Sequence, residues 1–258
     1  MRKVTLRQWL IVLAVVATVV VNVLANALPF NGLSTGDVSD RFDVYFTPAG
    51  YVFSIWGLIY IGLVAYAVYQ LQPRHSASPE LRGIALPFGV ASAGNIAWLF
   101  LWHYLLIPWT LVAMLPLLGA LVAIYLRLGI GRRTTSAAER WCVRVPFSIY
   151  LGWITVATIA NVTDVLYWMG WNGWGVSPAA WAVAVLVVAT AISVVVAHTR
   201  RDVAYGAVIA WAFVGIGVRQ AGTPTVAVTA GVMAALVGVA TVVSVLRRAP
   251  RVTTGAPA

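Results

Sequence analysis

Long apolar segments alternate with short polar ones along nearly the whole chain. Eight apolar segments can be distinguished, near residues 9–28, 50–71, 83–104, 106–127, 145–168, 178–198, 203–219 and 224–246. Each has room for about 17 to 24 helical residues, the length that an α-helix needs to cross the hydrocarbon core of a bilayer. The pattern therefore predicts an all-α bundle of about eight transmembrane helices.

Composition supports the same class of protein. Of the 258 residues, 61% are hydrophobic and 9% are charged, and the mean hydropathy is +0.90. A soluble domain of this length needs more polar surface, so the expected partner is the lipid bilayer. The only cysteine, Cys142, excludes an intramolecular disulfide and a cysteine metal cluster.

The basic residues predict the orientation in the membrane. Eight spans place both ends of the chain on one side. If that side is the cytoplasm, all 17 basic residues except Arg41 and Arg219 lie on the inner side or in the inner loops. This distribution follows the positive-inside rule and predicts a multi-pass protein of the cell membrane with cytoplasmic termini. The net charge of +10 then reflects topology and contact with anionic headgroups, and nucleic acid is not expected as a partner.

The first span has two interpretations. Its basic start, apolar run and Ala25-Asn26-Ala27 ending are also typical of a cleaved signal peptide. Its apolar run is about 18 to 20 residues, however, and signal peptides usually have roughly 7–15. A retained transmembrane helix is the favoured interpretation.

Three of the predicted helices carry aromatic and amide side chains on one face. These faces are Phe53, Trp56 and Tyr60 in the second span, Asn95, Trp98 and Trp102 in the third, and Tyr150, Trp153, Ala157 and Asn161 in the fifth. With the predicted topology they meet between the middle and the outer edge of the membrane, below an outer loop of residues 29–49. A pocket of this kind would suit a flat, largely apolar ligand. The alternative is a plain bundle core, in which the rings fill space and the asparagines pair between helices.

Signals for catalysis or metal binding are weak. Of the seven acidic residues only Asp164 lies on one of these faces, and a carboxylate near a helix end is more often solvated or capping. His103 is turned about 80° away from Asn95 on its helix, so it is not expected to ligate haem iron. Arg219 is expected to extend to the lipid headgroups. The alternative is that it pairs with an aspartate of the outer loop or with a carboxylate of a ligand. No catalytic residue, metal site or required cofactor is predicted.

The residues on these faces belong to three motifs. They comprise Pro48, Phe53, Trp56 and Tyr60 in the second span, Asn95, Trp98 and the aromatic Trp102 in the third, and Tyr150, Trp153, Ala157 and Asn161 in the fifth. They resemble P-x-W-x-F-x-x-x-W-x-x-x-Y, L-N-x-x-W-x-x-x-F-F and P-Y-x-x-W-x-x-x-A-x-x-L-N of the TspO/MBR family, the tryptophan-rich sensory proteins related to the mitochondrial translocator protein. The sequence departs from the family at Phe147 and Ser148, where the family has proline, and at Val165, where it has tryptophan.

The resemblance implies a five-helix membrane bundle over residues 1–170, with residues 171–258 forming three further helices and a short basic cytoplasmic tail. It also implies binding of porphyrins, haem and related tetrapyrroles, such as protoporphyrin IX, or of sterol-like molecules, by a sensor or transporter. Porphyrin breakdown would follow from the resemblance alone. A homodimer, whose contact a Gly89-xxx-Ala93 step could support, stays open.

Two other functions remain open. One is a membrane transporter of another small hydrophobic substrate, and the other is a structural membrane partner without a ligand. Ion-coupled transport is disfavoured, because it usually requires an ionisable residue in the middle of a span and none is found in the sequence.

Overall fold

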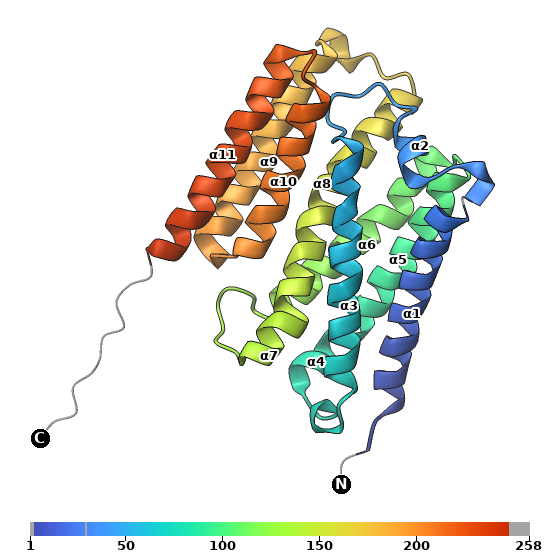
Figure 1. Ribbon diagram of the computed structural model, residues 1–258, viewed down its shortest axis with the longest axis vertical. Coiled ribbons are helices and arrows are strands. Elements are labelled where there is room, and N and C mark those ends of the chain that lie inside the picture. Colours follow the sequence, from blue (N-terminus) through green and yellow to red (C-terminus); the bar gives the residue numbers. More distant parts are fainter. Residues whose placement is uncertain (1–2, 29, 248–258) are drawn as a thin grey trace, which may run out of the picture.

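The computed structural model describes residues 3–28 and 30–247, and this part of the chain is helical without strands (Figure 1). Within it, seven helices are long and apolar enough to cross a membrane, and an eighth apolar helix, α10, has 17 residues. The all-α prediction is confirmed. Arg2, Arg248 and Arg251, which enter the charge distribution above, and the predicted cytoplasmic tail lie outside the described residues.

The long helices follow the predicted spans closely. They are α1 (Leu6–Ala27), α3 (Ile55–Leu71), α5 (Ala85–His103), α6 (Ile107–Arg127), α8 (Val145–Trp168), α9 (Pro178–Arg200), α10 (Val203–Arg219) and α11 (Pro224–Leu246). The short elements are η1 (Phe30–Gly32), α2 (Thr35–Ser39), η2 (Gly50–Ser54), η3 (Pro73–His75), α4 (Pro79–Gly83), α7 (Ala137–Glu139), the π-helical turn η4 (Arg140–Arg144) and η5 (Gly173–Gly175).

Helix α1 begins earlier than the apolar pattern predicts. Its start is set by polar residues, because the backbone N–H of Thr5 donates a hydrogen bond to Gln8 Oε1 at 2.9 Å. This is half of a capping box, which satisfies donors that the first helical turn leaves free. The first turn therefore contains the polar residues Arg7 and Gln8, and hydropathy alone does not detect it.

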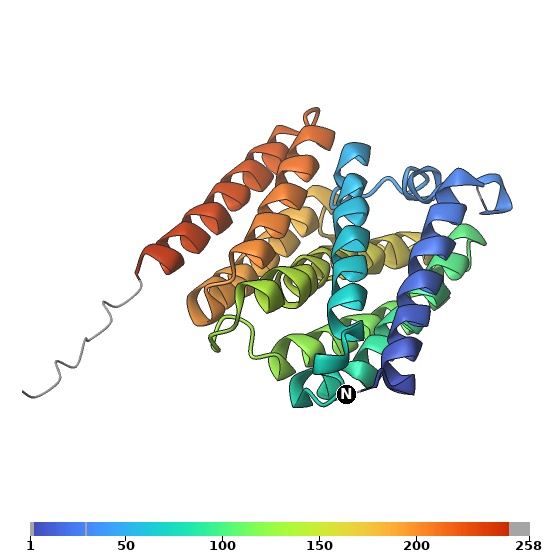
Figure 2. The same cartoon turned by 60° about the horizontal axis from the view of Figure 1, so that its bottom comes forward.

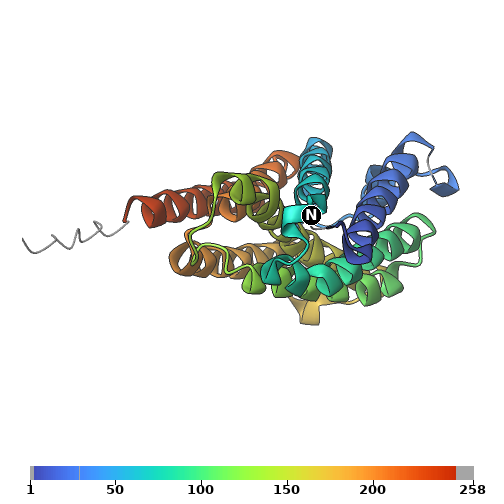
Figure 3. The ribbon, with the colours of Figure 1, turned by 90° about the horizontal axis from the view of Figure 1, so that it is seen from below.

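The helices form an elongated bundle with α1 on one flank and α11 on the other (Figures 1 and 3). Helix α5 packs against α1 and α6, and α8 packs against α6, α3 and α10. Helices α9, α10 and α11 pack on one another, as Figures 1 and 2 show on the left of each view. The start of α1 and the end of α11 lie at one end of the bundle, here called the inner end, and α2 lies at the opposite, outer end.

Helix α10 joins the last three helices to the first five at three levels. At the inner end, Tyr125 Oη donates to Asp202 Oδ2 at 2.9 Å. In the middle, Gly152 of α8 is so close to α10 that an added Cβ would lie 3.1 Å from Val208 Cβ. At the outer end, the backbone N–H of Ala49 donates to the carbonyl of Gly215 at 3.0 Å. The three helices are thus attached along the whole depth of the bundle.

The eight-helix arrangement predicts the sides on which inserted reporters will be found. A reporter fused after Arg251 should be cytoplasmic, and one inserted after Asn172 should be external, because an even number of crossings separates the two ends of the chain. A reporter inserted after Thr134 is the control and should share the side of the C-terminal fusion. An external C-terminal fusion would contradict the arrangement.

The contact at Gly215 predicts a local limit on side-chain size. An added Cβ would overlap Val52 Cγ2 and lie 3.3 Å from Pro48 Cβ, so Gly215→Ala should lower stability by about 1–3 kcal/mol. Gly238→Ala in α11 is the matched control, because no atom lies within 4 Å of its added Cβ. Thermal unfolding in detergent should give a lower midpoint for the first variant only, and equal midpoints would refute the close contact.

Candidate functional site

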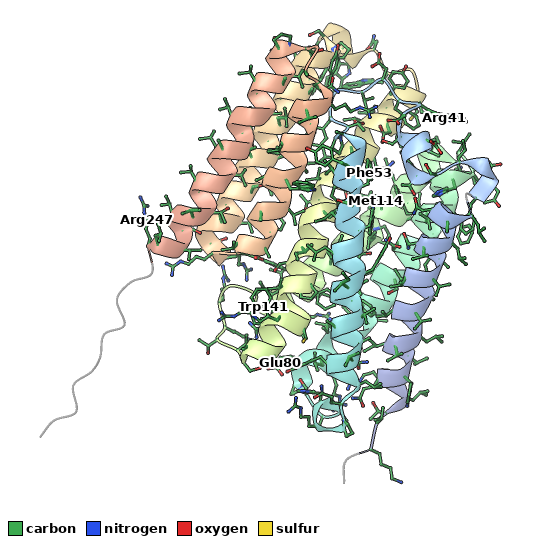
Figure 4. All side chains as sticks on the ribbon, in the orientation of Figure 1. Arg41, Phe53, Glu80, Met114, Trp141 and Arg247 are labelled. Atoms are coloured by element: carbon green, nitrogen blue, oxygen red, sulfur yellow. The ribbon has the colours of Figure 1, made fainter. Side chains whose placement is uncertain are left out.

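A narrow cavity lies below the outer loop, between α3, α5, α6 and α8. Its free volume is about 40 Å³. The wall is formed by Thr35, Ser39, Thr47, Pro48, Phe53, Trp56, Asn95, Trp98, Trp102, Met114, Leu117, Trp153, Ile154, Val156, Ala157, Ala160, Asn161 and Asp164. Figure 4 labels two of these residues, Phe53 of η2 and Met114 of α6, in the half of the bundle nearer the outer end.

A second, wider cavity adjoins the first and reaches α1. Its free volume is about 290 Å³, and its wall includes Asn22 and Asn26 of α1. The two cavities share Thr35, Phe53, Trp56 and Trp98, so these side chains separate one space from the other. The second cavity has the more polar wall.

Most of the site residues predicted from the sequence line these cavities. Those in the first wall are Phe53, Trp56, Asn95, Trp98, Trp102, Trp153, Ala157 and Asn161, and Tyr60 lines the second. Tyr150 is not among the lining residues of either cavity. It lies behind Trp56, with ring centroids 6.1 Å apart in an edge-to-face contact. Three helix faces that the sequence placed at one depth therefore do come together.

The aromatic rings form two groups on facing helices. On α5, Trp98 and Trp102 are stacked with centroids 5.3 Å apart and planes 19° apart. Opposite them, Trp153 of α8 meets Phe53 edge to face at 5.7 Å and Trp56 at 6.1 Å. Such arrangements hold the rings in fixed orientations and leave broad apolar faces along the cavity.

The two predicted asparagines are held by interhelical hydrogen bonds. Asn22 Nδ2 donates to Asn95 Oδ1 at 2.7 Å. Asn161 Oδ1 accepts from Trp98 Nε1 at 3.1 Å, and Asn161 Nδ2 donates to Thr110 Oγ1 at 2.7 Å. Partners of this kind offset the cost of placing an amide inside a membrane.

Not every polar atom in the wall has a partner. Among the described residues, Asn95 Nδ2, Trp153 Nε1 and Thr47 Oγ1 are buried without a hydrogen bond. Asp164 Oδ1 is a fourth such atom in the same wall. Buried donors and acceptors are nearly always paired in proteins, so four exceptions in one cavity wall indicate a place where further polar groups can bind.

Asp164 lies in a different environment from the one that the sequence suggested. It was expected to be solvated or to cap the helix, but only 4% of it is exposed and it lines the first cavity. The reason is that the outer loop, with Ser39 and Thr47 in the cavity wall, covers this end of α8. Because the outer loop comes from a distant part of the sequence, burial of Asp164 cannot be predicted from the sequence of α8 alone.

The outer loop is fixed to the helices around it. Trp102 Nε1 donates to the carbonyl of Thr35 at 3.1 Å. Arg219 was expected to extend to the headgroups, but its Nη1 forms an ion pair with Asp40 Oδ1 at 2.7 Å. At the start of α2, the backbone N–H of Ser34 donates to Asp37 Oδ2 at 2.8 Å, which lowers the pKa of the Asp37 carboxyl. The loop therefore closes the outer end of the cavity in a defined conformation.

His103 has a structural role in this region. Its side chain is fully buried, Nδ1 lies 2.8 Å from the Leu99 carbonyl, and Nε2 lies 3.4 Å from Thr35 Oγ1. Both ring nitrogens are thus occupied by protein groups. Within the described residues, no group of three or more His, Cys, Asp or Glu side chains could hold a metal ion.

Some lining residues were not predicted from the sequence. Asn22 could have been found, because an amide in the middle of an apolar run needs a partner or a cavity. Met114 and Leu117 could not, because nothing distinguishes them from other apolar residues of α6. Thr35 and Thr47 depend on how the outer loop folds, which has no simple sequence signal.

Comparison with known families agrees with this architecture. The model of the family described as TSPO-like protein matches residues 8–243. The match includes α9, α10 and α11, which lie beyond the five-helix resemblance that the motifs alone suggested. No curated protein and no solved structure matches the chain. The chain belongs to the TSPO-like protein family.

Proposed function

We propose that this membrane protein binds porphyrin- or haem-type tetrapyrroles, or similar flat hydrophobic ligands, in the cavity below the outer loop, as a sensor or transporter. The observation that carries the proposal is the convergence of aromatic faces from α3, α5 and α8 on one cavity. Flat apolar ligands gain affinity from stacking and from removal of apolar surface from water.

The ligand would be held by stacking and hydrogen bonds rather than by a metal ligand. The paired rings of Trp98 and Trp102 and the ring of Trp153 offer the apolar faces. Asn95 Nδ2 and Trp153 Nε1, which lack partners among the described residues, are donors for ligand carbonyl or carboxylate oxygens. No cofactor is required for this mode of binding, and protoporphyrin IX or haem would be the bound ligand itself.

A macrocycle needs more width than the first cavity offers. The outer loop is the one part of the wall that is not a membrane-spanning helix, so its movement is the least costly way to widen the space. We therefore propose that the ligand binds with a rearrangement of this loop. Loop and side-chain adjustment on binding is common in ligand sites of this kind.

A transporter for another small hydrophobic molecule is the second candidate function. The observation in its favour is the second cavity, which adjoins the first and reaches Asn22 and Asn26 of α1. Two adjoining spaces, separated by the side chains that they share, provide successive positions for a substrate, which a closed sensor pocket does not need. A homodimer remains compatible with either function. Gly89 and Ala93 are exposed on α5, and among the described residues no atom lies within 4 Å of a Cβ added at Gly89.

Two substitutions in the cavity wall should distinguish the effect of losing a stacking ring from the effect of losing cavity volume. Trp153→Phe removes part of a stacking surface and a hydrogen-bond donor, so protoporphyrin IX affinity should fall by about 1 kcal/mol or more, which is roughly fivefold to tenfold in Kd. Ala157→Leu should abolish most binding by filling the cavity. Affinity is measured from the porphyrin Soret absorbance, because removing a tryptophan changes the fluorescence quenching signal.

Each substitution has a matched control. Trp171→Phe alters a tryptophan that packs on Trp174 and Trp181 outside the cavity, and Ala191→Leu enlarges an exposed alanine of α9. Both should leave affinity unchanged. The proposed site is wrong if the controls weaken binding in equally folded protein while Trp153→Phe and Ala157→Leu do not.

A further inference from the structure

A carboxylate without a partner lies in the wall of an otherwise aromatic cavity. Asp164 is 4% exposed, and within the described residues its carboxylate forms no hydrogen bond or ion pair. Its Oδ1 is buried. An ionised carboxylate taken out of water without a partner is strongly unfavourable, so such a group is normally found beside a cation or a hydrogen-bond donor.

The protein offers Asp164 no free basic group at this end of the bundle. The two arginines that the predicted topology places on the outer side are Arg41 and Arg219. Arg219 is near enough for its charge to act on Asp164, but its ion pair is with Asp40 and it forms none with Asp164. The Arg41 side chain is exposed. The partner of Asp164 is therefore to be sought in the molecule that occupies the cavity.

The rest of the wall selects the kind of partner. Aromatic faces attract cations as well as flat rings, and Trp102 and Trp153 belong to the same cavity as Asp164. Thr47 Oγ1, also in this wall and without a partner among the described residues, can accept a second hydrogen bond. A carboxylate of a ligand, in contrast, would be repelled at this point.

The polar groups of the wall also give the ligand a direction. Asp164 follows Trp153 by eleven residues on α8, which places it about 16 Å closer to the outer end. The unpaired donor of Trp153 lies deep in the bundle, and the unpaired acceptor of Asp164 lies near the outer loop. A ligand with an acceptor at one end and a donor at the other fits this order.

We propose that Asp164 is a specificity-determining residue that recognises an N–H or protonated nitrogen of a flat aromatic ligand. The proposal rests on the proposed ligand-binding function of the cavity and adds the polarity that the ligand needs at its outer end. Among flat molecules of similar size, those with an exposed N–H or ammonium group are preferred, and those with a carboxylate there are rejected.

Two probes with one ring system test this preference. At pH 7.5, 9-aminoacridine is a cation with N–H donors, and acridine is neutral and has only an acceptor. Wild-type protein in a neutral detergent should bind 9-aminoacridine about tenfold or more tightly than acridine, as expected for a charge-assisted hydrogen bond. Asp164→Asn should reduce this ratio to about threefold or less and leave acridine affinity unchanged.

The controls locate the effect. Asp43→Asn removes an exposed acidic residue of the outer loop and should preserve the ratio, whereas Ala157→Leu should block both probes by filling the cavity. The proposal is overturned if wild type shows no preference, if Asp164→Asn keeps the full ratio, or if the preference survives in Ala157→Leu. Titration of the same samples with protoporphyrin IX separates the two proposals, because loss of porphyrin binding alone would refute only the tetrapyrrole assignment.

Discussion

The Asn161 side chain connects three helices, and the walls of the cavity depend on it. Its oxygen accepts from Trp98 of α5, and its nitrogen donates to Thr110 of α6, whose hydroxyl donates in turn to the Ile107 carbonyl at 2.6 Å. Each donating atom in this series of hydrogen bonds has an acceptor. In a membrane no water can replace a broken link, so the orientation of the Trp98 ring is fixed relative to α8.

The inner and outer ends of the bundle are closed in different ways. At the inner end, Gln8 of α1 and Gln70 of α3 each donate a side-chain hydrogen bond to the other's backbone carbonyl. At the outer end, the described residues of α1 and α3 form no such pair of reciprocal hydrogen bonds. The second cavity lies between them there. Side-chain hydrogen bonds thus close the bundle at the inner end, and the two cavities described above lie toward the outer end.

The fold and much of the site could be predicted from the sequence, because both depend on local periodicity. The faces that contain Trp56, Trp98 and Trp153 follow from helical spacing, and their common depth follows from the alternating direction of successive spans. Burial of Asp164 could not be predicted in the same way, and for Arg219 a loop aspartate was only an alternative to the favoured headgroups. Both depend on where the outer loop folds, and that position is set by contacts between residues more than a hundred positions apart, such as Ala49 with Gly215.

The loop that closes the cavity is also the surface on which α10 docks. Ala49 bonds to Gly215, and Asp40 pairs with Arg219, so the same segment has one face toward the ligand space and one toward the last three helices. A ligand that displaces this loop weakens the docking of α10. By thermodynamic linkage, docking of α10 weakens binding of that ligand by the same free energy. Under the proposed loop movement, occupancy of the cavity would change the affinity of α9, α10 and α11 for the rest of the bundle, and no residue of those helices would need to touch the ligand.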